Sequence, residues 1–254
     1  MNRKPLQQII FPLVFALILT YFLTHLPTIV AEESNSVKIT FVRPTVNPKQ
    51  GTPTGTEEGA GSHNGSCRLD NQQTDIEPLI ALVPEEKVAN ALDTYVWGKT
   101  TLSHPTLWFY TAYPPHTHAE LEIQNEEENL IYRTYLPLNN PPGFVSFTLP
   151  NTSPELKIGA KYLWYLYIKC NGEDTPDDVI SAWIERIALN PGKLRELDLV
   201  NFFAENGIWY DTITNLDQLR QNNPAEESYA SIWSNLLQQV GLNKISQKPV
   251  VQRF

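Results

Sequence analysis

Residues 162–168 are all aliphatic or aromatic, and this run restricts the possible folds of the chain more than any other segment. Successive side chains of an extended strand point to opposite faces, so both faces of this strand are apolar. The two rows are Tyr162, Trp164, Leu166 and Ile168 on one face and Leu163, Tyr165 and Tyr167 on the other. Water on either face would destabilise such a strand, so we expect a second layer over each. Residues 107–110 have the same character.

The segment 67–190 predicts a β-sandwich. It holds several short strands separated by turns rich in Pro and Gly, a pattern typical of two sheets packed face to face. We therefore expect an antiparallel immunoglobulin-like β-sandwich, with a closed barrel as the alternative. In one strand an apolar row alternates with Glu120 and Glu122, which predicts that both carboxylates lie on a solvated face and form no catalytic pair.

The periodicity becomes helical after residue 190, so the predicted fold class is α+β. Apolar residues recur at helical spacing over 191–242, and Gly207 suits the position just after a helix. The spacing is similar to one tetratricopeptide (TPR) hairpin followed by one helix. A single repeat cannot bury its own apolar face, so we expect this helical tail to pack over the row of Tyr165 and Tyr167. Residues 243–254 have no period and are expected to fray.

The N-terminal segment has the composition of an export signal. Arg3 and Lys4 precede an apolar run, and residues 5–31 contain no Asp, Glu, Lys or Arg. We interpret residues 1–31 as a signal peptide cleaved after Ala31. The alternative is an uncleaved membrane anchor formed by residues 5–31. The expected location is the periplasm, the cell surface or the extracellular space, or the membrane if the anchor is retained.

Residues 32–66 predict a flexible linker. They are rich in Gly, Pro and Thr and hold too few apolar side chains to offset the entropy of ordering, although residues 37–42 have the composition of a short strand. Beyond the linker, Cys67 and Cys170 are the two cysteines of the chain. An even pair in an oxidising compartment predicts one disulfide, with two buried free thiols as the alternative.

The charge distribution argues against a nucleic-acid partner. The formal net charge is −9, and the basic residues are scattered singly along the sequence. The sequence holds no complete catalytic or cofactor-binding signature, so we expect no cofactor.

Two groups of residues have metal-binding chemistry. The imidazoles of His104, His116 and His118 suit zinc, and the carboxylates within residues 173–178 suit calcium. A Pro-Pro turn precedes two of the histidines, and the acidic segment departs from the spacing of an EF-hand loop. The sequence therefore favours a solvated loop and an ordinary acidic turn.

A cluster of carboxylates and aromatic rings follows the first helix of the tail. It comprises Glu205, Asn206, Trp209, Tyr210 and Asp211. Two carboxylates beside aromatic rings resemble a glycosidase site in composition, whereas the helix end and the repeat spacing favour structural roles. We predict that this cluster is a candidate interaction surface.

Several short motifs are distributed over most of the chain. They are residues 65–67, 79–84, 100–101, 104–110, 159–165, 170, 183–186, 204–211, 236–237 and 240–242. Together they resemble the domain of unknown function 928, a family known mainly from cyanobacteria. The resemblance covers roughly residues 50–242, and its most specific part ends in Trp209, Tyr210 and Asp211. It implies an exported protein of a cyanobacterial envelope and supplies no established activity.

These observations favour a non-enzymatic function. We expect an exported envelope protein that acts as a protein-interaction or assembly module and binds an envelope protein partner. The alternative is a carbohydrate-binding module or a weak hydrolase of wall polysaccharide, because the many Tyr and Trp side chains suit sugar stacking. A third hypothesis is a structural protein held at the membrane by an uncleaved anchor.

Overall fold

The computed structural model describes residues 38–44, 79–87, 94–113, 116–140, 142–169 and 176–254. The chain separates into two compact units, Met1–Ser36 and Val37–Phe254, and the description below concerns the second unit. The predicted signal segment, most of the predicted linker and both cysteines lie outside the described residues. Among the helices within the described ranges, none is long and apolar enough to cross a membrane.

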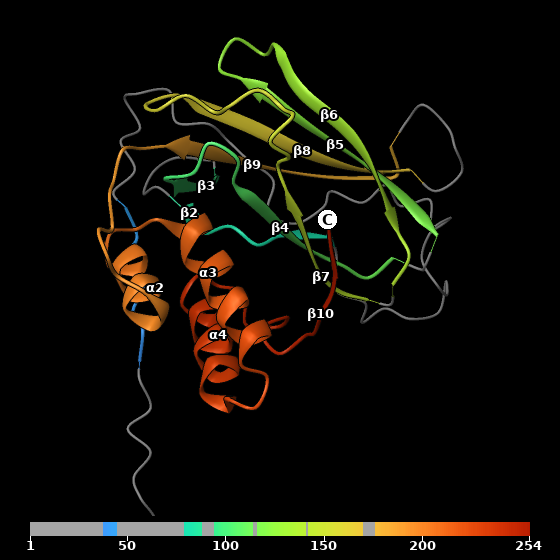
Figure 1. The fold of residues 1–254 in the computed structure, drawn as a ribbon. Helices are drawn as coiled ribbons and strands as arrows, with labels where there is room; N and C mark the ends of the chain where they lie inside the picture. The colour runs from blue at the N-terminus through green and yellow to red at the C-terminus, as the bar shows by residue number, and fades with distance from the viewer. Residues whose placement is uncertain (1–37, 45–78, 88–93, 114–115, 141, 170–175) are drawn as a thin grey trace, which may run out of the picture. The chain divides into compact units, whose positions relative to one another are not determined.

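The described residues form ten strands in two sheets (Figure 1). The four-stranded sheet has the order β1-β4-β7-β10, with bounds Ile80–Ala81, Thr106–Thr111, Gly143–Thr148 and Val250–Arg253. The six-stranded sheet has the order β2-β3-β9-β8-β5-β6, with bounds Glu85–Lys87, Thr94–Thr100, Asp178–Arg186, Lys161–Lys169, Thr117–Asn125 and Leu130–Leu138. Three helices accompany the sheets, which confirms the α+β class.

Both sheets are mixed, so the prediction of an antiparallel body is wrong at two places. Strand β10 runs parallel to β7, and β3 runs parallel to β9. The other paired strands are antiparallel. The period of a strand does not reveal the direction of its neighbour, because side chains alternate in the same way in both kinds of pairing.

The two sheets share one hydrophobic core with the helices. Every second residue of β8 is buried, and the buried row is Tyr162, Trp164, Leu166 and Ile168. Strand β4 is buried at all 6 of its positions, including both rows of the 107–110 run. Between the sheets, Phe147 of β7 stacks on Tyr132 of β6 with ring centroids 6.1 Å apart.

The helices are α2 (Glu196–Glu205), α3 (Trp209–Asn222) and α4 (Glu227–Gln239). Gly207 follows α2 with a φ of 69°, in the left-handed region that glycine tolerates. A Cβ at this position would lie 2.8 Å from the carbonyl oxygen of Val42. Close approach and backbone geometry therefore both require glycine here, and α3 starts two residues later.

Helices α3 and α4 cover the outward face of the four-stranded sheet. Trp108 of β4 donates from Nε1 to Oγ1 of Thr214 on α3 over 3.0 Å. Its ring lies 5.4 Å from that of Trp233 on α4, which also contacts Phe144 of β7 at 5.7 Å. Helix α3 also packs on β3, at the inner face of the six-stranded sheet.

The predicted position of the helical tail over Tyr165 and Tyr167 is wrong. Both tyrosines are only half-buried on the outward face of β8. Helix α3 instead contacts the opposite row of β8, where the Nε1 of Trp164 donates to the hydroxyl of Tyr210 over 2.9 Å. The helices instead cover the second doubly apolar run, in β4, whose Trp108 would otherwise lie in water.

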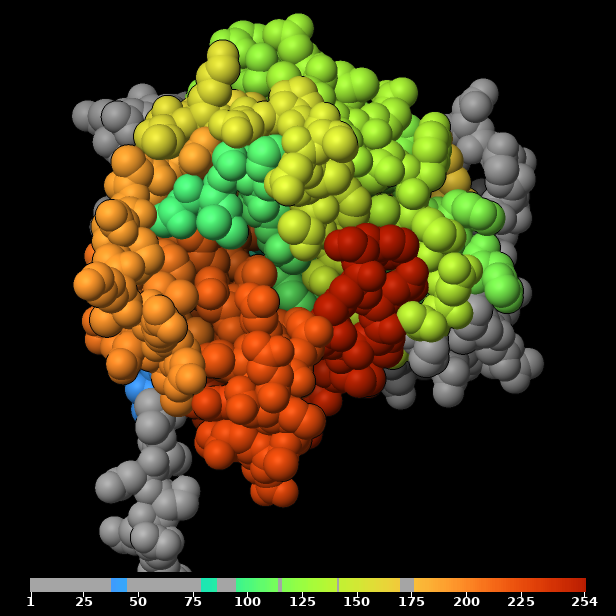
Figure 2. Space-filling view, viewed as in Figure 1, coloured from blue at the N-terminus to red at the C-terminus, as the bar shows by residue number. Residues whose placement is uncertain are grey.

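The expectation that residues 243–254 fray is also wrong. Strand β10 pairs with β7, and Arg253 donates from Nε and Nη2 to the two carboxylate oxygens of Asp217 on α3, both over 2.9 Å. In Figure 2 this segment (red) lies against the helical segment (orange) and the strands. A short strand at a sheet edge is held by its main chain and needs no periodic sequence.

Part of the predicted linker is packed rather than flexible. Ile39 and Phe41 are buried, and the Phe41 ring lies 4.9 Å from that of Trp209. The main-chain nitrogen of Val42 donates to the carbonyl of Ala204 over 3.0 Å. Residues 38–44 are not a strand, so two anchoring side chains and a few hydrogen bonds hold this segment on the helices.

Candidate functional site

The outward face of the six-stranded sheet carries a band of tyrosines and charged side chains. Strand β8 lies between β9 and β5, and its register with β5 places Tyr165 opposite Glu122 and Tyr167 opposite Glu120. Strand β6 continues the band, because Arg133 lies opposite Glu122 and Tyr135 lies opposite Glu120. We call this set the tyrosine face, and its members are Glu120, Glu122, Arg133, Tyr135, Tyr165, Tyr167 and Lys169.

The two carboxylates of the tyrosine face are buried and paired. Arg133 bridges them, with its Nε 3.1 Å from Glu120 Oε1 and its Nη2 in contact with Glu122 Oε1. The Nζ of Lys169 lies 2.6 Å from the other oxygen of Glu120. The prediction that Glu120 and Glu122 are solvated is therefore wrong, since residues from both neighbouring strands cover and neutralise them.

The tyrosines beside these carboxylates are neutral hydrogen-bonding groups. Burial raises the pKa of Tyr167 to about 12, and the negative charge of Glu122 adds to this effect. Burial also raises the pKa of Tyr165, with a smaller effect from Glu128. Both phenols therefore keep their protons at neutral pH, and each offers a hydroxyl at the rim of an aromatic ring.

Ring faces on the six-stranded sheet are partly occupied, both within the tyrosine face and on β3. The rings of Tyr165 and Tyr167 stack on each other, with centroids 5.6 Å apart and an interplanar angle of 11°. On β3, the Nζ of Lys99 lies 5.6 Å from the ring centroid of Trp97. Tyr135 is 64% exposed and is the most accessible aromatic side chain of the tyrosine face.

The sequence cluster predicted as an interaction surface is mostly buried, so that prediction is wrong. Trp209 and Tyr210 are inside the core, where Trp209 Nε1 donates to the Leu82 carbonyl over 2.6 Å and the Tyr210 hydroxyl donates to the Trp183 carbonyl over 3.1 Å. The surface side chains of the cluster are Glu205 and Asn206.

Asp211 of the same cluster holds α3 on the end of β3. Its carboxylate accepts a hydrogen bond from Thr100 Oγ1 over 2.6 Å and from the main-chain nitrogen of Thr101 over 3.0 Å. Burial raises the pKa of Asp211, and the hydrogen bonds from both threonines oppose that rise. The role of Asp211 is therefore structural, which is the role that the helix end and the repeat spacing favoured.

The predicted metal-binding groups do not come together in the structure. Within the described ranges, no group of three or more His, Cys, Asp and Glu side chains is placed to hold a metal ion. His116 and His118 are exposed, whereas the Nε2 of His104 lies 3.3 Å from the Ser153 carbonyl. Of the acidic turn, residues 173–175 lie outside the described residues, and buried Asp178 accepts a hydrogen bond from Tyr113 over 2.7 Å.

Sequence reasoning missed the tyrosine face as a site, although one signal was present. Arg133 and Tyr135 occupy alternate positions of the strand that follows the Glu120 and Glu122 strand across an acidic turn. A hairpin register aligned on that turn places the arginine beside the carboxylates.

The fold and the site define an α+β protein with two mixed sheets, a helical layer and a partly exposed sheet face that is charged and aromatic. The chain belongs to the family described as Domain of Unknown Function (DUF928), whose model matches residues 58–250. The match confirms the resemblance stated from the sequence, and it spans the strands and helices that build the tyrosine face and its support.

Comparison with other proteins adds two distant structures. No curated protein matches the chain. A fibronectin type III domain of the human collagen alpha-1(XX) chain is 13% identical, with a TM-score of 0.24 over 38% of this chain and 82% of that one. The Parabacteroides merdae beta-glucuronidase is 11% identical, with a TM-score of 0.20 over 57% of this chain and 20% of that one.

Proposed function

We propose that the protein is an exported, non-enzymatic binding module that docks an envelope protein through the tyrosine face. The observation that carries the proposal is that none of the helices within the described ranges covers this face, although its carboxylates are already paired and buried. A partner would not have to desolvate unpaired charges there, which lowers the cost of docking. Tyrosine and arginine are also enriched at protein interfaces, because each combines apolar area with hydrogen-bonding groups.

The geometry supports a protein partner over a polysaccharide. Sugar stacking needs open ring faces, whereas Tyr165 and Tyr167 each cover one face of the other, and the ammonium of Lys99 lies over Trp97. Each ring of the stacked pair therefore has at most one face left for a sugar. Exposed Tyr135 is the observation that favours the carbohydrate-binding alternative.

Photo-crosslinking in the living envelope tests the proposal directly. A benzophenone amino acid at position 135 is expected to form a discrete protein adduct, and the adduct should disappear when Arg133→Glu reverses the charge of the face. The matched control is the same probe at Ile158, which is 60% exposed and lies outside the tyrosine face. Equal adducts at both positions, or none at position 135, would contradict docking at this face.

A binding assay separates the carbohydrate alternative. If the purified protein is retained on insoluble wall polysaccharide and Tyr135→Ala abolishes retention while no protein adduct forms, the sugar-binding function is correct and the protein-docking proposal is wrong.

The proposal includes export and a disulfide, both supported by sequence alone. We infer that the mature chain starts at Glu32 and that Cys67 pairs with Cys170. The intact mass of the chain recovered from the envelope tests both points, because cleavage removes residues 1–31 and a disulfide removes two hydrogens. A full-length mass would instead support the uncleaved anchor.

The proposal also extends to the finer fold assignments. Two facing sheets support an immunoglobulin-like sandwich, and the close packing of α2 on α3 supports a TPR-like hairpin. An experimental structure superposed on both classes of fold would test these assignments.

A further inference from the structure

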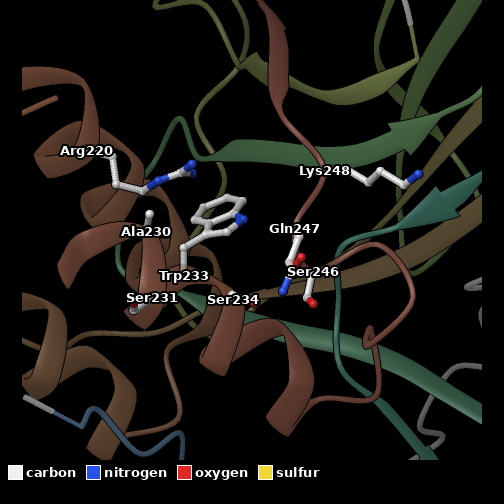
Figure 3. A pocket seen from close by; sticks show the side chains of 8 residues that line it. All are labelled: Arg220, Ala230, Ser231, Trp233, Ser234, Ser246, Gln247 and Lys248. Carbon is white, nitrogen blue, oxygen red and sulfur yellow. The ribbon is translucent and has the colours of Figure 1, made fainter. Parts of the chain in front are cut away.

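A cavity of about 270 Å³ lies between the last turn of α3, helix α4 and the segment that leads into β10 (Figure 3). Its volume is far above the roughly 10–15 Å³ needed to hold one water molecule. The polar and aromatic side chains that line it are Arg220, Ser231, Trp233, Ser234, Ser246, Gln247 and Lys248.

Two N–H donors in the wall of this cavity have no acceptor. Arg220 Nη1 and Trp233 Nε1 are both buried, and neither has a hydrogen-bond partner among the residues that the structure describes. Arg220 lies over the Trp233 indole, with its Cζ 4.7 Å from the ring centroid. Guanidinium and indole nitrogens can only donate, so a ligand that satisfies them must present acceptors. A buried donor without a partner destabilises a fold, and this cost points to a missing group.

The charges around the cavity favour a negatively charged ligand. Asp217 is the nearby carboxylate, and Arg253 occupies both of its oxygens at 2.9 Å. Arg220 Nη1 lies 3.7 Å from Asp217 Oδ1, which is too long for a hydrogen bond. One carboxylate is thus shared by two arginines.

The lowered pKa of Arg220 is consistent with an excess of positive charge around the cavity. Burial lowers its pKa, and the positive charge of Arg253 acts in the same direction, while Asp217 opposes both. A second anion beside Arg220 would compensate this partly buried cation.

We propose that this cavity binds a small oxyanion, through Arg220 and the indole nitrogen of Trp233. Carboxylate, phosphate and sulfate all present the oxygen acceptors that the two donors require. Separate titrations with each class of anion distinguish these ligands. The hydroxyl of Ser234 and the amide of Gln247 can provide further donors along the wall, whereas the hydroxyls of Ser231 and Ser246 already donate to main-chain carbonyls. The site is independent of the tyrosine face, which lies on strands β5, β6 and β8.

Nitrogen–proton NMR of the indole groups in the purified full chain tests the site without disturbing it. Titration with inorganic phosphate, sulfate or citrate is expected to shift the indole signal of Trp233 in a saturable way, with chloride at matched ionic strength as the control. Trp233→Phe assigns the signal because that variant keeps an aromatic ring and removes only the N–H. The absence of a saturable shift with every anion would overturn the proposal.

Two variants test which groups bind the anion. Arg220→Gln and Trp233→Phe are each expected to weaken binding by about tenfold or more in calorimetric titration, as for loss of a charge-assisted hydrogen bond. Arg195→Gln removes the same charge from an exposed position before α2 and should leave binding unchanged. Undiminished binding in both cavity variants, or an equal loss in Arg195→Gln, would show that the anion binds elsewhere.

Discussion

The two sheets present their outward faces to different surroundings. Trp108 and Phe144 of the four-stranded sheet lie beneath α3 and α4, whereas Tyr165 and Tyr167 of the six-stranded sheet are left half-exposed beside a network of ion pairs. Both faces are aromatic, and their chemistry differs in one respect. A phenol keeps its polar tip hydrated while its ring packs on neighbouring charged stems, so a tyrosine row tolerates an open position. Phe144 lacks such a tip and needs a covering layer.

The largest expected loss in the free energy of unfolding comes from removing the contact between the covered sheet face and the helices. Trp108→Ala removes a buried indole and its hydrogen bond to Thr214, so we expect a loss of about 3–5 kcal/mol in the free energy of unfolding. Tyr165→Ala on the open face should cost only about 1 kcal/mol. Urea denaturation of both variants measures the difference, and equal losses would show that the two faces are packed alike.

The attachment of α3 to β3 is expected to depend on pH. Asp211→Asn should lower stability by about 2–3 kcal/mol at acidic pH, because the amide nitrogen cannot accept a hydrogen bond from Thr100 or Thr101, whereas both oxygens of a protonated carboxyl group can. Burial raises the pKa of Asp211 in the folded state, so its favourable contribution is complete below the unfolded pKa and declines as pH rises through the folded pKa.

Denaturation of the wild type and Asp211→Asn across the acid range checks this sign. The stability difference between them should be largest at the most acidic pH and should shrink toward neutrality. A difference that grows with pH would mean that the ionised carboxylate is the stabilising form.

A smaller effect is expected from the ion pair that fixes β10 beside α3. Arg253→Ala leaves the buried carboxylate of Asp217 without its bidentate partner, and the partly exposed arginine limits the loss to about 1–2 kcal/mol. Thermal denaturation measures this change. As a control, Arg195→Ala at an exposed position should leave the melting temperature unaltered.

The smallest effect on stability is expected on the tyrosine face. Tyr135→Ala should change the free energy of unfolding by less than about 0.5 kcal/mol, because the side chain is 64% exposed. The same change should weaken capture of the envelope protein partner proposed above. A large stability loss would show that Tyr135 supports the sheet, and the contrast between the two faces would then be weaker than described.

Local patterns in the sequence were sufficient for many of the elements, although not for β10, and they were insufficient for the partners of those elements. Alternation over residues 119–124 predicts the strand β5, and Gly207 predicts the end of α2. Each of these signals comes from neighbouring residues. The choice between the 107–110 run and Tyr165 with Tyr167 as the surface under the helices depends on long-range packing, which periodicity does not contain.

The candidate sites were harder to predict for the same reason. Trp209 and Asp211 have the composition of a surface site but point into the core and to the end of β3. Arg220 and Trp233 become neighbours only because α4 packs beside α3. Only a structure shows that the donors in this pair lack acceptors.

We expect the parallel pairing of β3 with β9 to form late in the assembly of the six-stranded sheet. Strands β8 and β9 are adjacent in sequence and can zip together as a hairpin, whereas β3 must wait until the intervening strands have been placed. Until then the edge of β9 offers unpaired amides and carbonyls to any other extended chain. We therefore expect the nascent protein to be most prone to self-association before β3 docks, and chaperones that shield this edge to have their main effect at that stage.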